Sequence, residues 1–389
     1  MVIQEITVMH SVPRWLPQTE TWLHNQIKSL PPLVHNHVTC EAVENLDQFP
    51  MSNIYVSKNF PTWRYKFYMA LGKLGIRDHY EAFLVQQAQK CRASVLHSHY
   101  GHMGWRNIGA AGKANLRHIV TFYGFDVNKL PMVDPRWRER YKELFGHVCY
   151  ILCEGEHMAG RIKEMGCPEH KVLVHRLGVR VGAIPFRPRA WVPGETLRVL
   201  IAASFREKKG IPYALDALGE LQHDVPLQIT IIGDAGSEPA GLVEKDKIMM
   251  TVEKHDLTSR VRLLGFQPHQ VLFDEAYKHH VFLSPSVTAG DGDTEGGAPV
   301  AIIEMAATGM PVVSTTHCDI PEVILNGYTG LLAEERNVDG LVLHLQWLVK
   351  HPHNWLPMLT AGRKHVEALY DASKQGTRLA EIYRQLVLQ

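Results

Sequence analysis

Short apolar runs rich in β-branched residues alternate along this chain with longer stretches whose apolar positions recur every three or four residues. The first pattern is typical of buried strands and the second of amphipathic helices. In the first part of the chain we expect strands at residues 3–8, 94–97, 118–121, 148–153 and 172–175. Helices are expected between them, for example at residues 20–30, 65–90 and 155–165.

The alternation stops at residues 180–194, which are rich in Pro and Arg, and then starts again. We interpret this interruption as a linker between domains. Beyond it we expect strands at residues 197–202, 227–232, 261–264, 281–283 and 311–314. The helices expected there are residues 211–221, 238–254, 267–277 and 299–308.

A chain of 389 residues is too long for one ordinary hydrophobic core. The predicted fold class is α/β, with two Rossmann-like domains whose parallel sheets face each other across a cleft. We place the N-terminal domain at residues 1–180, the linker at 181–196 and the C-terminal domain at 197–370. A last helix, within residues 371–389, is expected to pack back on the N-terminal domain.

The composition also indicates in which cellular compartment the protein is expected. Apolar residues make up 45% of the chain, and no run approaches the roughly 18 apolar residues that a membrane-spanning helix requires. No basic segment precedes an apolar run at the start of the chain, as it would in a secretory signal. The six cysteines are scattered, which favours reduced thiols. We therefore expect a cytoplasmic protein.

The net charge is only +1, but its distribution is uneven. Residues 1–180 hold 22 Lys and Arg against 15 Asp and Glu, and the remainder holds 19 against 25. Residues 58–92 mix basic and aromatic side chains, which suits either a peripheral contact with an anionic membrane or a solvated helix with a core-facing aromatic side. Neither the overall charge nor any motif favours nucleic acid as a partner.

The most informative segment is residues 284–309, where a Gly-rich polar loop leads from a strand into a helix at about Pro299. Loop glycines allow backbone N–H groups to approach an anion, and a helix N-terminus favours negative charge. The segment therefore predicts a phosphate site without a Walker lysine. It also holds two carboxylates, Glu295 and Glu304, whose natural partners are the hydroxyls of a sugar or ribose.

A second segment, residues 203–210, follows another strand directly and carries Arg206 and Lys209. Cations in this position would neutralise the charge that develops on a leaving diphosphate. The alternative interpretation is a solvated basic start of a helix.

Together these segments resemble the donor site of the retaining glycosyltransferases of family 4, which have the GT-B fold. That family has a basic residue before a Lys-Gly pair and, later, two glutamates separated by seven residues. The resemblance extends over nearly the whole chain, and the start of the chain is similar to exopolysaccharide- and colanic-acid-type members. The matching stretches are PQTETWLHNQI, HSHYG, TFYGFD, GCPEHKVLVHRLG and PEVILNGYTGLL.

The resemblance implies a metal-independent transfer of a sugar, with retention, from a nucleotide-sugar bound by the C-terminal domain. It implies that Glu304 binds the donor ribose, that Glu295 contacts the donor sugar and that Lys209 binds the phosphates, with Arg206, Tyr123 and Asp126 as further catalytic candidates. Donor-binding candidates are the backbone or side chains of Ser204, Gly296, Gly297, Ala298, Pro299 and Val300. The acceptor-side candidates of the N-terminal domain are Thr19, Glu20, His99 and His102.

The chain departs from the family pattern at three places. Eight residues, not seven, separate Glu295 from Glu304. The position five residues before Lys209, which is usually Arg, is Ser204. The usual His of the T-F-H-G-x-D segment is Tyr123, whose phenol titrates near 10, so that an acid-base role there is not expected.

Two patterns suggest metals, and we favour neither. Asp291 and Asp293 form a D-x-D, but that metal motif belongs to a single-domain architecture. His97, His99 and His102 have a spacing compatible with zinc, without an evident fourth ligand. We expect no metal and no cofactor, because the nucleotide-sugar is a substrate.

The leading hypothesis is a glycosyltransferase of surface polysaccharide synthesis, acting on a hydroxyl of a saccharide or lipid-linked acceptor. The alternatives are a non-catalytic nucleotide-sugar-binding protein with a degenerate site and a sugar-nucleotide epimerase. The sequence leaves open the sugar, the base, the linkage and the oligomeric state.

Overall fold

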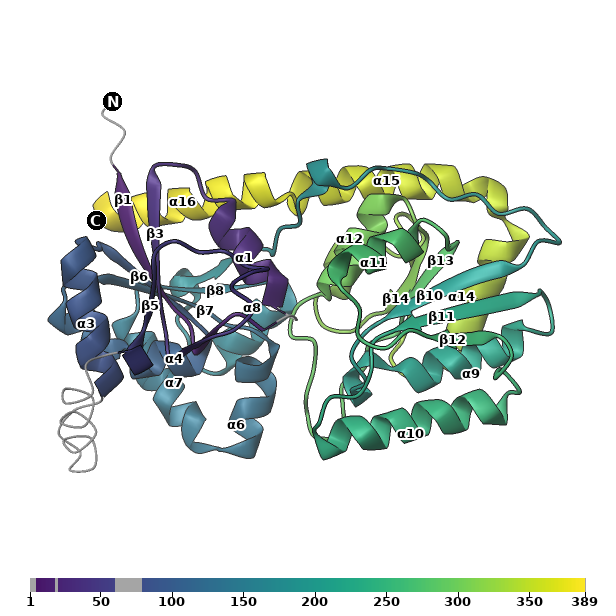
Figure 1. Ribbon diagram of the computed structural model, residues 1–389, viewed down its shortest axis with the longest axis horizontal. Helices are drawn as coiled ribbons and strands as arrows, with labels where there is room; N and C mark the ends of the chain where they lie inside the picture. The colour runs from purple at the N-terminus through teal and green to yellow at the C-terminus, as the bar shows by residue number, and fades with distance from the viewer. Residues whose placement is uncertain (1–4, 18–19, 60–78, 389) are drawn as a thin grey trace. The chain divides into compact units, whose positions relative to one another are not determined.

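In the computed structural model, residues 5–17, 20–59 and 79–388 are described, and they form two compact units (Figure 1). One unit comprises Met1–Gly178 together with Ala372–Gln389, and the other comprises Val179–Asp371. Each unit contains its own parallel sheet covered by helices, so the predicted α/β class with two Rossmann-like sheets is confirmed.

The N-terminal unit is built on a seven-stranded sheet in the order β5-β3-β1-β6-β7-β8-β9, in which every pairing is parallel. Its strands are β1 (Ile6–Ser11), β3 (Val34–Cys40), β5 (Ile54–Val56), β6 (Val95–His99), β7 (Arg117–Thr121), β8 (Tyr150–Cys153) and β9 (Val172–Val174). A separate pair consists of β2 (Arg14–Trp15) and β4 (Ala42–Val43). The helices are α1 (Thr21–Lys28), α3 (His79–Cys91), α4 (Gly101–Arg106), α5 (Ile108–Lys113), α6 (Leu130–Val133), α7 (Arg136–His147), α8 (Glu156–Glu164) and α16 (Ala372–Leu388).

The C-terminal unit is built on a six-stranded parallel sheet in the order β12-β11-β10-β13-β14-β15. Its strands are β10 (Leu197–Ala202), β11 (Leu227–Ile232), β12 (Val261–Leu263), β13 (Val281–Ser284), β14 (Val312–Thr315) and β15 (Leu331–Ala333). The helices are α9 (Ile211–Leu221), α10 (Pro239–Lys254), α11 (His269–Ala276), α12 (Val300–Thr308), α13 (Ile320–Val323), α14 (Val338–Lys350) and α15 (Trp355–Leu369).

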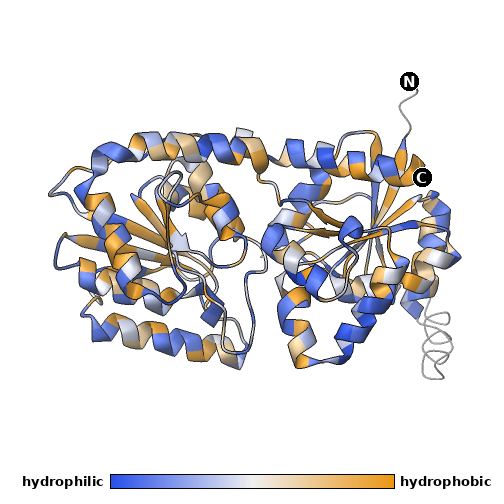
Figure 2. Ribbon diagram, turned by 180° about the vertical axis from the view of Figure 1, so that it is seen from behind, coloured by the Kyte–Doolittle hydropathy of each residue, from blue (hydrophilic) through white to orange (hydrophobic). Residues whose placement is uncertain are grey.

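The central strands of both sheets are apolar because helices cover each of their faces. In β10, Val199 and Ile201 pack with α9, α10 and α14, whereas Leu200 packs on the opposite face with α12. Figure 2 shows the same division, with orange strands inside helices whose outward faces are largely blue. The polar residues that remain at the strand ends are therefore the exceptions that need an explanation.

Most expected elements are present within a few residues of their expected bounds, but five strands were missed, two of which, β2 and β4, have only two residues each. The sequence of β3 begins Val-His-Asn-His, and this polar run hid its apolar positions. The strands β5 and β15 are only three residues long, which is too short for a periodicity to show. Most of the basic and aromatic segment at residues 58–92 lies outside the described residues.

The last helix packs against the sheet of the N-terminal unit. Leu379, Ile382 and Leu386 of α16 belong to the apolar cluster that contains Ile6 and Val8 of β1. Helix α16 also contacts α1, and a Cβ on Gly376 would lie 2.0 Å from the backbone oxygen of Ser29, at the end of α1. Gly376 therefore permits the two helices to approach closely. Among the described residues, no helix is both long and apolar enough to cross a membrane.

We predict that Gly376→Ala destabilises the protein by roughly 1–3 kcal/mol, because the added methyl group overpacks the contact between α16 and α1. The matched control is Gly160→Ala in α8, where an added Cβ meets nothing within 4 Å. That control is expected to raise stability by roughly 0.5–1 kcal/mol through helix propensity. The measurement is the free energy of unfolding in urea, and equal effects of the two variants would contradict the close approach.

Candidate functional site

In the C-terminal unit, the two segments singled out in the sequence lie side by side. Strands β10 and β13 are neighbours, so the loops that follow them leave the same edge of the sheet. The Val287 N–H donates to the Lys208 oxygen at 2.9 Å. A Cβ on Gly210, which has a φ of +64°, would lie 1.9 Å from the Pro285 oxygen. Glycine is thus required where the two loops meet.

Lys209 and Glu295 form an ion pair across these loops. Lys209 Nζ lies 2.7 Å from Glu295 Oε2, and the Ser286 hydroxyl donates to Oε1 at 3.0 Å. The side chains of Lys209 and Glu295 are only 18% and 7% exposed. Burial raises the pKa of Glu295, but the Lys209 and Lys208 ammonium groups outweigh it and lower that pKa to about 2. Glu295 is therefore an ionised carboxylate with both oxygens bonded.

The D-x-D carboxylates are used by the loop itself. Lys208 Nζ lies 3.2 Å from Asp293 Oδ1 and donates to the Thr294 oxygen at 2.8 Å. Asp291 Oδ1 accepts from the Asp293 N–H at 3.0 Å. These bonds shape the loop and bring a second ammonium group close to Glu295.

His317 is a residue of this cluster that the sequence analysis missed. The Glu295 N–H donates to its Nε2 at 3.1 Å, so in the neutral ring the proton lies on Nδ1, which donates to Glu335 at 2.6 Å. His317 follows β14, the next strand of the sheet after β13. The rule that polar residues at strand ends gather at one edge would have found it.

Glu304 lies in the second turn of α12 and is buried. The His269 Nε2–H donates to Glu304 Oε1 at 2.9 Å. This bond raises the pKa of His269, against burial, and it fixes the orientation of the carboxylate. Among the described residues, Oε2 of Glu304 has no hydrogen-bond partner of its own, which leaves it available to a hydroxyl.

The loop before α12 holds the residues that were expected to bind the donor through their backbone. Gly296 has a φ of +79° and its N–H donates to the Thr294 hydroxyl at 3.1 Å. Helix α12 begins at Val300 and is preceded in the chain by Gly297, Ala298 and Pro299. Pro299 is the N-cap residue, and it makes no side-chain cap hydrogen bond. A helix start of this kind binds anions.

Arg206 does not join the cluster: it is half exposed, and its guanidinium lies 4.0 Å from Glu238. Ser204 is partly buried in the loop after β10.

In the N-terminal unit, the candidates gather where β6 and β7 end. The buried Asp126 accepts from the N–H groups of Tyr123, at 2.9 Å, and Gly101. Burial raises the pKa of Asp126 to about 7 despite these bonds, and burial raises the pKa of Tyr123 above its usual range. Asp126 therefore holds the two strand-end loops together.

The described acceptor-side candidates, Glu20, His99 and His102, lie around Tyr123. His99 Nδ1 lies 2.8 Å from the Tyr123 hydroxyl. Glu20 hydrogen-bonds Tyr100, whose ring packs on Tyr123. His102 packs near Tyr100 and Trp137, and Thr19 lies outside the described residues.

Several known proteins are similar to this chain in sequence or in fold. The family model of glycosyl transferases group 1 matches residues 196–351. The chain is 30% identical over 312 residues to the putative colanic acid biosynthesis glycosyltransferase WcaL of Salmonella typhimurium, covering 78% of this chain and 74% of that one. It is 31% identical over 271 residues to the amylovoran biosynthesis glycosyltransferase AmsK of Erwinia amylovora, covering 69% and 64%. The fold is similar to that of Anabaena HepE in complex with UDP-glucose, with a TM-score of 0.77, 15% identity and 98% and 100% coverage.

We predict that Lys209→Met lowers the free energy of unfolding by roughly 3 kcal/mol, because it leaves the Glu295 carboxylate buried without its counter-ion. Lys209→Met combined with Glu295→Gln removes that charge and should recover most of the loss. Urea unfolding at pH 7 measures both. A double variant as unstable as the single one would show that the ion pair is not the cause.

A second prediction concerns His269. Because the Glu304 bond raises its pKa in the folded chain, the pair stabilises the fold below the ordinary His pKa and loses this contribution as pH rises through the folded value. The His269 side chain is 47% exposed, so the effect is only a few tenths of a kcal/mol. Comparing wild type with His269→Gln, the stability difference should be larger at pH 5.5 than at pH 9. A difference that grows with pH would contradict the pairing.

Proposed function

The chain belongs to the family of glycosyl transferases group 1, and we propose that it transfers a sugar, with retention, from a nucleotide-sugar to a saccharide hydroxyl in exopolysaccharide synthesis. It is a glycosyltransferase with the GT-B fold. The observation that carries the proposal is the cluster at the edge of the C-terminal sheet, where Lys209, Glu295 and the start of α12 lie together and Glu304 is held by His269.

The donor would be held by three kinds of contact. The backbone N–H groups at the start of α12 and the Lys209 ammonium group suit the diphosphate. The open oxygen of Glu304 suits a ribose hydroxyl, since a carboxylate only accepts hydrogen bonds. Glu295 suits a hydroxyl of the transferred sugar once the phosphates draw Lys209 away from it.

We propose that the reaction needs no metal, because the developing charge on the diphosphate is met by the Lys209 ammonium group and backbone donors. The Asp293 carboxylate, which a D-x-D metal would require, is already bonded to Lys208. The names of the related colanic acid and amylovoran enzymes favour a polysaccharide precursor as the acceptor, and a lipid-linked saccharide fits that role. We also propose that the protein makes a peripheral contact with a membrane surface.

We predict that Glu304→Gln lowers kcat/KM for the donor roughly 10-fold or more, because a ribose hydroxyl loses a charged acceptor of similar shape. Glu253→Gln, on the exposed side of α10, is the matched control and should keep full turnover. Transfer is measured with UDP-, GDP- and ADP-sugars in EDTA, after a thermal-shift screen identifies the nucleotide that binds.

Four outcomes would contradict the proposal. Equal turnover by the two Gln variants would remove the role of Glu304. Tight donor binding without turnover would indicate a binding protein, and an epimerised donor without transfer would indicate an epimerase. Activity abolished by EDTA and restored by Mn²⁺ would contradict the metal-free mechanism.

A further inference from the structure

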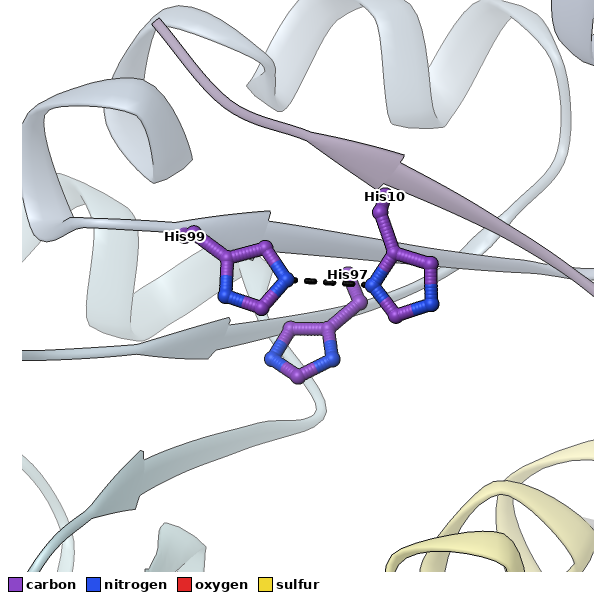
Figure 3. Close-up of side chains that lie close together, drawn as sticks. All are labelled: His10, His97 and His99. Atoms are coloured by element: carbon purple, nitrogen blue, oxygen red, sulfur yellow. Dashed lines mark hydrogen bonds between the residues drawn. The ribbon is translucent and has the colours of Figure 1, made fainter. Parts of the chain in front are cut away.

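The buried polar groups at the carboxyl ends of the N-terminal strands bond one another. His10 of β1 and His97 and His99 of β6 are fully buried and lie together, with ligating nitrogens within 4.8 Å of one another (Figure 3). His97 bonds to the hydroxyls of Tyr383 at 2.6 Å and Thr121 at 2.7 Å. Both ring nitrogens of His97 therefore already have a partner.

The other two rings belong to a buried chain of hydrogen bonds across neighbouring strands. Asn36 of β3 bonds to His10 Nε2 at 3.1 Å, and His10 Nδ1 lies 3.0 Å from His99 Nε2. The chain ends at Tyr123, whose hydroxyl lies 2.8 Å from His99 Nδ1. All six ring nitrogens of the three histidines are thus bonded within the protein, and we assign no metal centre to them.

The amino ends of the same strands differ, because polar groups there border a hollow. The hollow has a volume of about 490 Å³ and lies where α3 and α5 end, where β6 and β7 begin and beside the last turn of α16. All of its lining residues belong to the N-terminal unit, and its volume is that of a small-molecule site. The polar lining residues are Gln89, Arg92, Ser94, Asn115 and Arg117, and alanine side chains and Val387 complete the lining.

The lining of the hollow contains two positive charges and no negative one. Arg92 and Arg117 are both exposed, and in the part of the chain that the structure describes neither guanidinium group has an ion pair or a hydrogen bond. The nearby Lys113 shows the commoner arrangement, since its ammonium group pairs with Glu81. Two unpaired guanidinium groups on one small hollow make its potential positive, which attracts an anion.

The backbone holds Arg92 at the hollow at a steric cost. Helix α3 closes with a bond from the Ala93 N–H to the Ala88 oxygen at 2.9 Å, and Arg92, which lies between the helix and that donor, has a φ of +54°. Asn115 takes a similar position after α5, with a φ of +52°. Glycine is the usual residue at this point of a helix end, because left-handed backbone is unfavourable for a residue with a Cβ. The chain therefore has polar side chains beside the hollow where glycine would fold more easily.

The favourable interaction of cations with helix ends does not by itself account for the two arginines. Carbonyl groups at a helix C-terminus attract cations, but α3 and α5 already carry Lys90 and Lys113 in their last turns. These lysines lie within the helices and need no left-handed backbone. Arg117 is the first residue of β7 and lies outside both helices. A ligand shared by Arg92 and Arg117 accounts for both.

We propose that this hollow, which we call the amino-edge site, binds the phosphate group of a phosphate monoester, with Arg92 and Arg117 as its charged partners. A phosphate monoester carries about two negative charges at neutral pH, which match the two guanidinium groups. Each guanidinium group can donate two parallel hydrogen bonds to it. Gln89 and Asn115 supply amide donors for the remaining oxygens, and the alanines and Val387 suit the uncharged part of the ligand. The site is separate from the nucleotide-sugar site proposed above, which lies in the C-terminal unit.

The experiment separates two sources of such a phosphate group, a soluble ester and the headgroup of a lipid. The probes are glycerol 3-phosphate for the soluble source and vesicles of phosphatidylcholine, with or without phosphatidic acid, for the lipid source. Binding of the full chain is measured by titration calorimetry for the ester and by co-sedimentation for the vesicles, at low and at high salt. The affinity should fall with salt, because the charged groups are exposed.

The variant Arg92→Gln combined with Arg117→Gln keeps polar side chains and removes both charges. Its affinity for the probe that binds should be lower than that of wild type by roughly 10-fold or more, because hydrogen bonds to charged groups contribute more than neutral ones. Arg138→Gln combined with Arg378→Gln removes the same net charge at exposed positions outside the hollow and is the matched control. Phosphate binding in the C-terminal unit is common to all of these variants, so it cancels in the comparison.

A further variant separates binding from folding. Arg92→Gly removes one guanidinium group and also relieves the left-handed backbone, so it should weaken binding of the probe while raising the melting temperature of the free chain by roughly 1–3 °C. Asp256→Gly relieves a φ of +53° in the C-terminal unit and should leave binding unchanged. Loss of binding in a variant that is more stable than wild type cannot be explained by unfolding.

The possible results either support or overturn the proposal. Loss of glycerol 3-phosphate binding in the double Gln variant, with the control unchanged, supports a soluble ester. The same pattern seen only with phosphatidic acid vesicles supports a lipid headgroup. Equal binding by the double Gln variant and its control would overturn the proposal, and so would the absence of binding to both probes. None of these measurements uses sugar transfer, so failure of the proposed glycosyltransferase function would leave the result standing.

Discussion

The buried ion pair between Lys209 and Glu295 is the interaction on which the donor-side loops depend. It joins positions 86 residues apart, and it forms because β10 and β13 are neighbours and Gly210 lets the two loops touch. Removing either charge would leave the other buried alone, which costs far more than an exposed pair would. The pair also limits the net charge of this site. The positive charges of Lys208 and Lys209 are balanced by the carboxylates of Asp293 and Glu295. The site therefore does not bind anions without further selection. A ligand must offer anionic groups to the lysines and hydroxyls to the carboxylates together, which is what a nucleotide-sugar provides.

One rule explains where polar residues occur in both units. The strands of a parallel sheet are covered on both faces and are therefore apolar until they end. In the C-terminal unit the residues beyond β13 and β14 include Ser286, Glu295 and His317, which bond to one another. In the N-terminal unit His99 ends β6 and Tyr123 follows β7, and these two also bond to one another. In both units the polar groups are held by hydrogen bonds before any ligand arrives, so the cost of orienting them is met in folding.

Much of the fold could be predicted from the sequence, because long apolar strands and amphipathic helices carry a strong local signal. The strands β10 and β11 and the helix α9 have the expected bounds. The strand β3 was missed for an informative reason: Asn36, which breaks its apolar pattern, belongs to the buried chain that ends at Tyr123. Of the candidate site, the pairing of Lys209 with Glu295 was within reach of strand-end reasoning. The partner of Glu304 and the bond between His10 and His99 were not, because His269 and His10 are distant in sequence from their partners and have no motif, so only the packed structure brings them into contact.

The family pattern has His at the position of Tyr123. This chain lacks that His, but it has another imidazole, that of His99, next to Tyr123. A ring nitrogen remains at this edge of the sheet, on His99, and the phenol extends from it as the terminal group. The phenol does not titrate near neutral pH, whereas a histidine in that place would change its charge with its surroundings. Burial holds the pKa of His99 well below its usual range, so that its ring is neutral, and the bond to His10 and the stacked ring of His97 fix its orientation.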